Sequence, residues 1–199
     1  MKWILTEEKF LSDEQVKSLV NTSSDAAKLA EMKDNWLPIR DWMIIDLALN
    51  TGLRVQEVAD LKVEDLHLEY NQSSLVVQNG KGGKKRVVRI GSKLKAHLKR
   101  YIKLGLNKGE YVFSSSRGEN LTRSALLMIV KNNMKLAGLP AHFHFHSLRH
   151  TYATRLYKSS NNNLRLVQRQ LGHVSVATTQ VYADIMDEDV DKALEKLEE

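Results

Sequence analysis

Side chains able to bind anions, move protons or act as nucleophiles occur at five separated sites in this chain of 199 residues. They comprise two arginines, a lysine, two histidines and a tyrosine: Arg54, Lys81, His146, Arg149, His173 and Tyr182. Attack on phosphorus places extra negative charge on nonbridging oxygens, and fixed guanidinium groups stabilise that charge. A lysine can protonate a leaving oxygen. A tyrosine hydroxyl, with an ordinary pKa of about 10, needs a base or positive field to become a nucleophile.

The first two sites are ordinary when each is taken alone. Arg54 follows a Thr-Gly break, and Glu57 stands three residues later, where it can hold the guanidinium on one helical face. The same spacing also suits a surface ion pair. Lys81 lies in the Gly-rich segment QNGKGGKKRVV, which can carry a lysine into a cleft or form a solvated hairpin tip.

The remaining sites lie in the last third of the chain. His146 and Arg149 stand at i and i+3 on the predicted first turn of a helix, where both can donate to one anion. Gly172 is expected to end a helix just before His173. Tyr182 follows within VATTQVYADI. Only the whole set, read together, indicates metal-free phosphodiester chemistry.

The elements that must position these residues are mostly helices. Ser12, Asp13, Glu14 and Gln15 form a capping-box pattern that opens a first helix. Further helices are predicted at 37–50, 53–61, 92–104, 124–137, 147–159, 164–172, 176–185 and 187–199. Short strands at 66–70, 74–78 and 85–90, joined by turn residues, predict a small antiparallel sheet, and 111–118 is another brief extended piece. The expected fold class is α+β, mainly α, with a three-stranded antiparallel sheet.

Four segments resemble the sequence boxes of the tyrosine recombinases, the phage integrase and Xer-type site-specific recombinases. They are ALNTGLRVQEVADLKVEDL, GKGGKKRVV, HSLRHTYAT and LGHVSVATTQVYADI. The boxes stand in the family's order, and the resemblance covers roughly Ser12 to Asp184. It implies the helical catalytic domain of that family and an enzyme that cuts and rejoins DNA strands.

The resemblance also implies roles for individual residues. Arg54 and Arg149 would clamp the scissile phosphate, with Glu57 as the acidic residue that supports them. His146 and His173 would add hydrogen bonds and handle protons.

For the covalent step, the resemblance implies that Tyr182 forms a 3′-phosphotyrosyl intermediate while Lys81 protonates the leaving 5′ oxygen. A 5′ hydroxyl of a partner strand would then reverse the step, so no metal, ATP or other cofactor is expected. Lys84 and Lys85 lie on the same hairpin and are the alternative candidates for this proton donor. We expect Lys84, Lys85 and Arg86 to contact DNA.

Composition agrees with a polyanionic partner without establishing one. Thirty Lys and Arg against 24 Asp and Glu give a net charge of +6 and a pI near 9.4, which also fits a mildly basic cytosolic protein. The chain has no cysteine and no apolar run long enough to span a membrane, and its N-terminus becomes acidic too early for a secretory signal. We expect a cytoplasmic, nucleoid-associated protein that binds double-stranded DNA, monomeric in solution and tetrameric on recombining DNA.

A zinc site is the main alternative for the histidines. His146 and His150 have the i, i+4 spacing of a helical metal site, with His142 and His144 nearby. The glutamate of the HExxH pattern is absent, since Ser147 follows His146, and no cysteine or carboxylate lies close by to complete a shell. We therefore expect no metal.

Two other functions fit the same boxes. A type IB topoisomerase would use the same chemistry to relax supercoils, and a DNA-binding regulator on this fold would have no catalysis. The regulator would be favoured by a missing nucleophile or arginine, and here all are present.

We expect one catalytic domain over residues 1–199, with 1–11 as an N-terminal extension and without the DNA-grasping N-terminal domain common in the family. The chain would then be either a fragment or a short, single-domain recombinase. The amphipathic segment 187–199 is expected to dock either on a neighbouring protomer or on its own domain.

Overall fold

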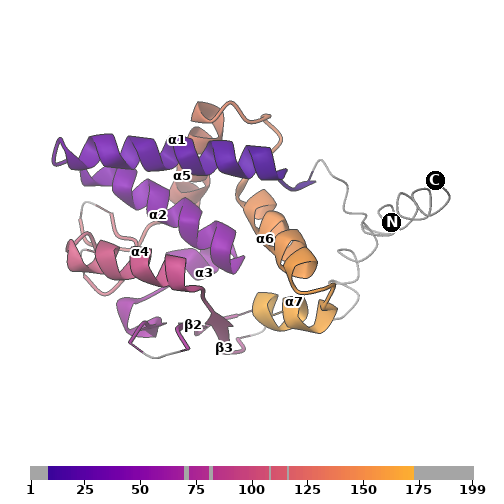
Figure 1. Cartoon of the computed structure of the whole chain (residues 1–199). Helices are drawn as coiled ribbons and strands as arrows, with labels where there is room; N and C mark the ends of the chain where they lie inside the picture. The colour runs from indigo at the N-terminus through magenta and orange to yellow at the C-terminus, as the bar shows by residue number, and fades with distance from the viewer. Residues whose placement is uncertain (1–8, 70–71, 81–82, 108, 116, 173–199) are drawn as a thin grey trace.

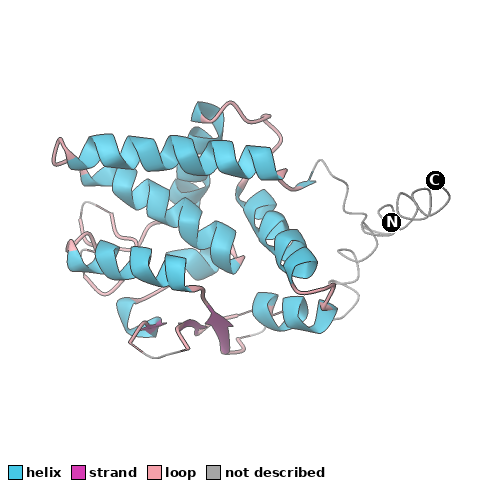
Figure 2. Cartoon of the chain, viewed as in Figure 1, coloured by secondary structure: helices cyan, strands magenta, loops and turns pink. Residues whose placement is uncertain are grey.

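The structure is a computed structural model that describes residues 9–69, 72–80, 83–107, 109–115 and 117–172 (Figure 1). Its helices are α1 (Asp13–Glu31), α2 (Trp36–Thr51), α3 (Val55–Ala59), α4 (Ser92–Lys103), α5 (Arg123–Leu136), α6 (Phe145–Ser159) and α7 (Leu164–Leu171). A short 3-10 helix, η2 (Val63–Asp65), leads into the strands β1 (Leu66–His67), β2 (Ser74–Val77) and β3 (Arg86–Arg89). The expected α+β, mainly helical fold is confirmed (Figure 2). The helices predicted at 176–185 and 187–199 lie outside the described residues.

The core is organised around α2. Every residue from Met43 to Leu49 is buried, because α1, α4, α5 and α6 all pack against this helix (Figure 1). The predicted capping box opens α1: the Ser12 hydroxyl accepts from the Gln15 backbone N–H, and the Gln15 side chain accepts from the Ser12 N–H. No helix in the described part of the chain is both long enough and apolar enough to cross a membrane.

The three strands form an antiparallel sheet in the order β1-β2-β3. β1 and β3 are shorter than the predicted 66–70 and 85–90. On its outer side, β3 lies against α7, and the Arg89 backbone N–H donates to the Gln170 side chain. The strand that follows the Lys-rich hairpin (residues 78–85) therefore lies beside the end of α7.

The prediction of one helix over 53–61 was wrong at its start. Gly52 ends α2 in the left-handed conformation, at φ 61°, and Arg54 is extended, so α3 begins only at Val55. A Cβ on Gly52 would lie 2.4 Å from Tyr152 Cδ1 and 2.8 Å from a methyl carbon of Leu171. Position 52 therefore requires glycine both for its backbone angle and for the close packing of α2 on α6 and α7.

α6 is unusual in burying polar side chains along much of its length. Thr151 accepts from the Leu11 backbone N–H and donates to the Ser147 carbonyl. His150 is only 8% exposed, and its burial, followed by the positive charge at His146 and Arg149, lowers its pKa to about 3. At neutral pH His150 is therefore an uncharged part of the core.

Replacing Gly52 by Ala should lower the free energy of unfolding by roughly 2 to 4 kcal/mol, because the strained backbone and the overlap with Tyr152 both act. Gly105→Ala is the matched control: Gly105 has φ 65°, but nothing lies within 4 Å of its added Cβ. That variant should lose only about 1 kcal/mol in urea-induced unfolding. Equal losses in the two variants would show that close packing at Gly52 has no energetic effect.

The pKa of His150 predicts a loss of stability in mild acid. Below pH 6.5, the ordinary pKa of histidine, His150 gains a proton in the unfolded chain but stays neutral in the folded chain. The free energy of unfolding therefore falls as the pH is lowered from 6.5 towards 3. His150→Gln removes this titration, so its unfolding free energy should fall less steeply than the wild type's between pH 6.5 and 4.5. The exposed His142→Gln is the control and should keep the wild-type slope. Identical slopes for wild type and His150→Gln would contradict the assignment.

Candidate active site

Arg149 lies on α6 with only 3% of its surface exposed. Its guanidinium donates to the backbone carbonyl of Gly52, at the end of α2, and to that of Leu171, at the end of α7, over 3.0 Å. The last carbonyls of a helix have no partner within it and carry partial negative charge. A buried cation is therefore placed where two helix C-termini can stabilise it.

Arg54 is held at the start of α3 by Glu57. The Glu57 carboxylate accepts from both the backbone N–H and the guanidinium of Arg54, each over 2.8 Å. The Arg54 side chain keeps 26% of its surface exposed, whereas that of Glu57 keeps 4%. The predicted contact between Arg54 and Glu57 is present, and Arg54 makes it from the N-cap position of α3.

Glu57 also binds Arg86, which stands at the start of β3. The two terminal nitrogens of Arg86 donate to the two carboxylate oxygens, each over 2.7 Å. Burial alone would raise the pKa of Glu57, but the hydrogen bond from Arg86, the Arg54 backbone N–H and both guanidinium charges lower it to about 2. Glu57 is thus a permanent anion between two cations.

His146 is close enough to Arg149 and Arg54 to interact electrostatically with both. It is an exposed residue, yet partial desolvation by its surroundings lowers its pKa, and so do the charges of Arg149 and, more weakly, Arg54. The structure therefore brings His146, Arg149 and the distant Arg54 into one electrostatic cluster. A neutral imidazole at pH 7 can both donate and accept a hydrogen bond.

The histidine rings of this region contact one another, His144 and His146 nearly parallel and His146 and His150 edge to face. The ring centroids of His146 and His150 lie 5.3 Å apart, and those of His144 and His146 lie 6.5 Å apart. Among the residues that the structure describes, no group of three or more His, Cys, Asp or Glu is arranged to hold a metal ion.

Three expected site residues, Lys81, His173 and Tyr182, lie outside the described residues. The residues on either side of Lys81 and Gly82 are described, and the Gly80 N–H donates to the Lys84 carbonyl across the hairpin turn. Lys84 and Lys85 are exposed on that hairpin. At the other site, Gly172 ends α7 with φ 65°, which confirms the predicted helix end just before His173.

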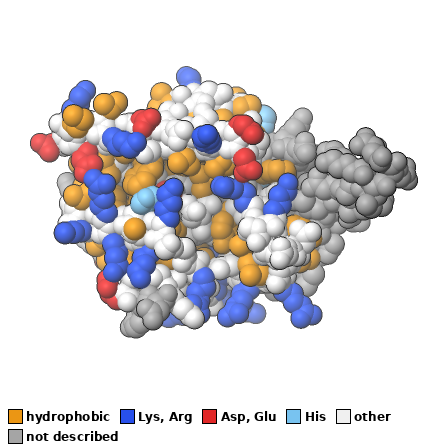
Figure 3. Space-filling model, viewed as in Figure 1, with side chains coloured by type: hydrophobic (Ala, Val, Ile, Leu, Met, Phe, Trp, Pro, Cys, Tyr) orange, Lys and Arg blue, Asp and Glu red, His pale blue; other side chains and the backbone are white. Residues whose placement is uncertain are grey.

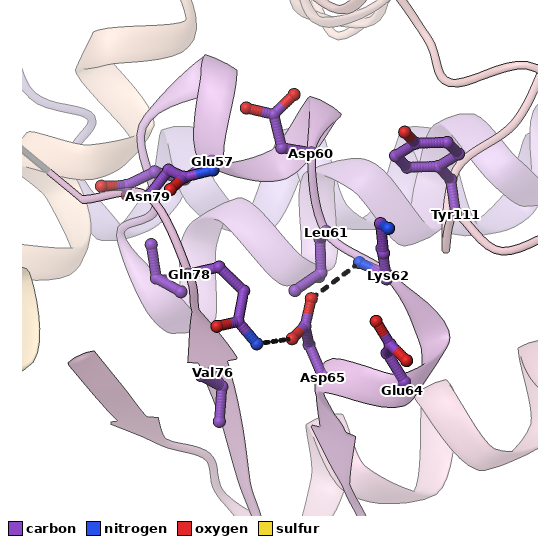
Figure 4. Close-up of a pocket in the computed structure, with 11 residues that line it drawn as sticks. Glu57, Asp60, Leu61, Lys62, Glu64, Asp65, Val76, Gln78, Asn79 and Tyr111 are labelled. Atoms are coloured by element: carbon purple, nitrogen blue, oxygen red, sulfur yellow. Dashed lines mark hydrogen bonds between the residues drawn. The ribbon is translucent and has the colours of Figure 1, made fainter. Parts of the chain in front are cut away.

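A polar cavity of about 400 Å³ adjoins Glu57 on the side of η2 and β2 (Figure 4). Asp65 anchors its floor by accepting from the Lys62 backbone N–H and the Gln78 side chain. Asp60 and Glu64 are exposed carboxylates on its wall. Their negative charge would repel a phosphate, whereas Arg54 and Arg149 supply positive charge on the other side of Glu57.

Sequence reasoning missed two features of this site. One is the pair of backbone carbonyls, at Gly52 and Leu171, that hold Arg149. The other is the pairing of Arg86 with Glu57, since Arg86 was expected to contact DNA. The glycines at 52 and 172 were the only local signal, because each marks a helix end with exposed carbonyls.

The chain matches the phage integrase family over residues 9–189. Tyrosine recombinase XerA of Pyrococcus horikoshii is 34% identical over 178 residues, which cover 88% of this chain and 60% of that protein. Tyrosine recombinase XerD of Ralstonia nicotianae is 34% identical over 183 residues, covering 89% of this chain and 56% of that protein. The chain thus spans about three fifths of the length of the curated relatives it matches.

The fold of this chain is also similar to that of solved site-specific recombinases. One match is the post-cleavage complex of the XerH site-specific recombinase with its palindromic difH substrate. It superposes with a TM-score of 0.78 at 27% sequence identity, and the match covers 96% of this chain and 53% of that one. The XerA recombinase superposes with a TM-score of 0.75 at 28% sequence identity, and the match covers 94% of this chain and 64% of that one. Together with the ordered sequence boxes, these matches show that the chain belongs to the phage integrase family, the tyrosine recombinases.

Proposed function

We propose that this chain is the catalytic domain of a site-specific DNA recombinase that cleaves and rejoins strands through a covalent link to Tyr182. The observation that carries the proposal is the convergence of Arg54, Arg149 and His146 around one potential anion site. Arg149 reaches this place by bonding to Gly52, 97 residues away in the sequence. The names of the relatives, and the XerH complex with cleaved DNA, support the same activity.

The arginines supply electrostatic stabilisation of the scissile phosphate. Glu57 fixes Arg54, and the two helix-end carbonyls fix Arg149, so neither guanidinium must reorganise when charge develops on the nonbridging oxygens. His146, neutral at pH 7, takes part by hydrogen bonding and proton handling, together with His173.

In the proposed cleavage step the Tyr182 oxygen forms a bond to phosphorus while the bond to the 5′ oxygen breaks. His146 and His173 assist removal of the tyrosine proton, and Lys81 gives a proton to the leaving oxygen. Attack by the 5′ hydroxyl of a partner strand reverses these changes. The energy of the phosphodiester bond is conserved in the phosphotyrosyl link, so the reaction needs no metal, ATP or other cofactor.

The proposed partner is double-stranded DNA. Lys and Arg side chains gather along the lower edge of the molecule, where Figure 1 places β3 and α7 (Figure 3). Arg165 and Arg169 of α7 are both exposed. On the neighbouring hairpin, Lys84 and Lys85 are proposed to contact backbone phosphates.

The proposal extends to assembly and to the ends of the chain. The protein would act on DNA in the cytoplasm, at the nucleoid of a bacterial host, as a monomer in solution and a tetramer on recombining DNA. Residues 187–199 would dock on the neighbouring protomer, and residues 1–11 would be an extension of the catalytic domain.

A suicide substrate tests the covalent chemistry without a known target sequence. Nicked duplexes with a randomised centre would lose the short 5′-hydroxyl strand after cleavage, so the covalent complex accumulates. We expect denaturing electrophoresis to show the complex, and peptide mapping to locate the DNA on Tyr182. Tyr182→Phe should abolish the complex, whereas Tyr111→Phe, a half-buried tyrosine beside Lys62, should retain it.

Attachment to another tyrosine would overturn the assignment of Tyr182. Absence of any covalent complex would favour a DNA-binding regulator. A topoisomerase would relax a supercoiled plasmid processively and would exchange no strands between the randomised duplexes that the protein cleaves. This pair of results would favour that function.

The role of Lys81 can be tested through the leaving group. A 5′ sulfur in place of the bridging oxygen leaves without protonation, so it makes a general acid unnecessary. Lys81→Ala should slow cleavage of ordinary DNA by about 100-fold or more, and the sulfur substrate should restore most of that loss. Single-turnover rates on the two substrates provide the measurement.

Lys84→Ala and Lys85→Ala are the matched controls on the same hairpin. Neither should show a defect that the sulfur substrate corrects. If one of them does, and Lys81→Ala does not, the proton donor is that lysine.

A further inference from the structure

Arg86 lies where three segments of the candidate site meet. Its guanidinium binds Glu57 of α3 through both terminal nitrogens. A Cβ on Gly80, at the base of the hairpin, would lie 3.3 Å from Arg86 Nη1. A Cβ on Gly172, at the end of α7, would lie 2.4 Å from Arg86 Cδ and 2.7 Å from its Nε. The side chain thus packs against both glycine backbones while it holds the carboxylate.

The surroundings of Arg86 differ from those of a DNA-contacting side chain. Its side chain is only 12% exposed, whereas the neighbouring Lys84 and Lys85 are exposed. Both terminal nitrogens already donate to one carboxylate in the fork geometry that arginine favours. A phosphate would have to displace Glu57 to take the same donors.

The backbone of Arg86 lies at the base of the hairpin, so the contacts of its side chain also hold the hairpin in place. Arg86 opens β3 and pairs with Val77 of β2, so one residue fixes the hairpin at the point where both strands leave the sheet. Lys81 directly follows Gly80, and His173 directly follows Gly172. The contacts of Arg86 therefore set the start of both segments relative to Glu57 and Arg54.

We propose that Arg86 is a positioning residue that sets the Lys81 hairpin and the turn before His173 against Glu57, in place of the DNA contact expected from the sequence. The roles of Lys81 and His173 rest on the proposed function, whereas the junction itself rests on the contacts of Arg86 with Glu57, Gly80 and Gly172. Gly172 is required on this view because any side chain there would displace Arg86. Lysine could supply the charge of Arg86 but not its two parallel hydrogen bonds.

The first test separates positioning from DNA contact. Arg86→Met should lower the rate of covalent-complex formation at saturating DNA by roughly 10- to 100-fold, as loss of a supporting residue typically does. Its DNA affinity and the salt dependence of that affinity should stay at wild-type values. Lys85→Met is the comparison for a phosphate contact and should weaken binding and reduce the salt slope by about one. If Arg86→Met behaves like Lys85→Met in binding and cleaves normally at saturation, the proposal is wrong.

The second test separates positioning of Lys81 from a general loss of folding. The defect of Arg86→Met should shrink at least about tenfold on the 5′-sulfur substrate, because that substrate does not need the proton donor. Arg86→Lys, which keeps the charge, should fold and show the same pattern if the Met variant is unstable. Arg100→Met, an exposed arginine of α4 that pairs with Glu31 of α1, should match wild type on both substrates. An equal defect on both substrates in the folded variants would contradict positioning of Lys81.

A third measurement does not depend on catalysis. In wild type the Glu57 carboxylate, followed by NMR, should remain charged down to about pH 2, and in Arg86→Met its pKa should rise. If the carboxylate titrates alike in the two proteins, Arg86 does not hold Glu57. If the pKa shifts but wild type forms no covalent complex, the junction stands and the proposed recombinase function fails.

Discussion

The candidate site depends on one buried cation, the guanidinium of Arg149, held by the last carbonyls of α2 and α7. Burying a charge is costly unless partners replace its water, and two helix C-termini supply oxygens that have no partner within their own helices. Both helices end in a left-handed glycine, Gly52 or Gly172, which turns the chain away and leaves those oxygens accessible. The arginine thereby joins α2, α6 and α7 at the proposed phosphate site.

A second constraint is charge balance. Arg54, Arg86 and Arg149 all bring positive charge to the site where we propose that a phosphate binds. The buried carboxylate of Glu57 neutralises part of this charge and fixes the orientation of Arg54 and Arg86. Burial and then the remaining positive charge lower the pKa of His146, so its imidazole is neutral at pH 7. The geometry is therefore organised before any ligand arrives, as electrostatic catalysis requires.

Local sequence signals predicted much of the fold. The capping box at Ser12, the helix end at Gly172 and the three antiparallel strands are all present, because each depends on residues near in sequence. The start of α3 was wrong, since nothing local showed that Gly52 must turn tightly to accommodate Tyr152 and Leu171. Propensity alone favoured a helix that began two residues earlier.

The sequence by itself determined the family, the order of the chemical residues and the spacing of Arg54 with Glu57 and of His146 with Arg149. These are properties of residue type and short-range periodicity. Tertiary structure alone decided that Arg149 binds the ends of two helices, and that Arg86 turns inward to Glu57 although it follows two exposed lysines. Both contacts join segments distant in the chain, and their geometry exists only after α2, α6, α7 and the sheet have packed together.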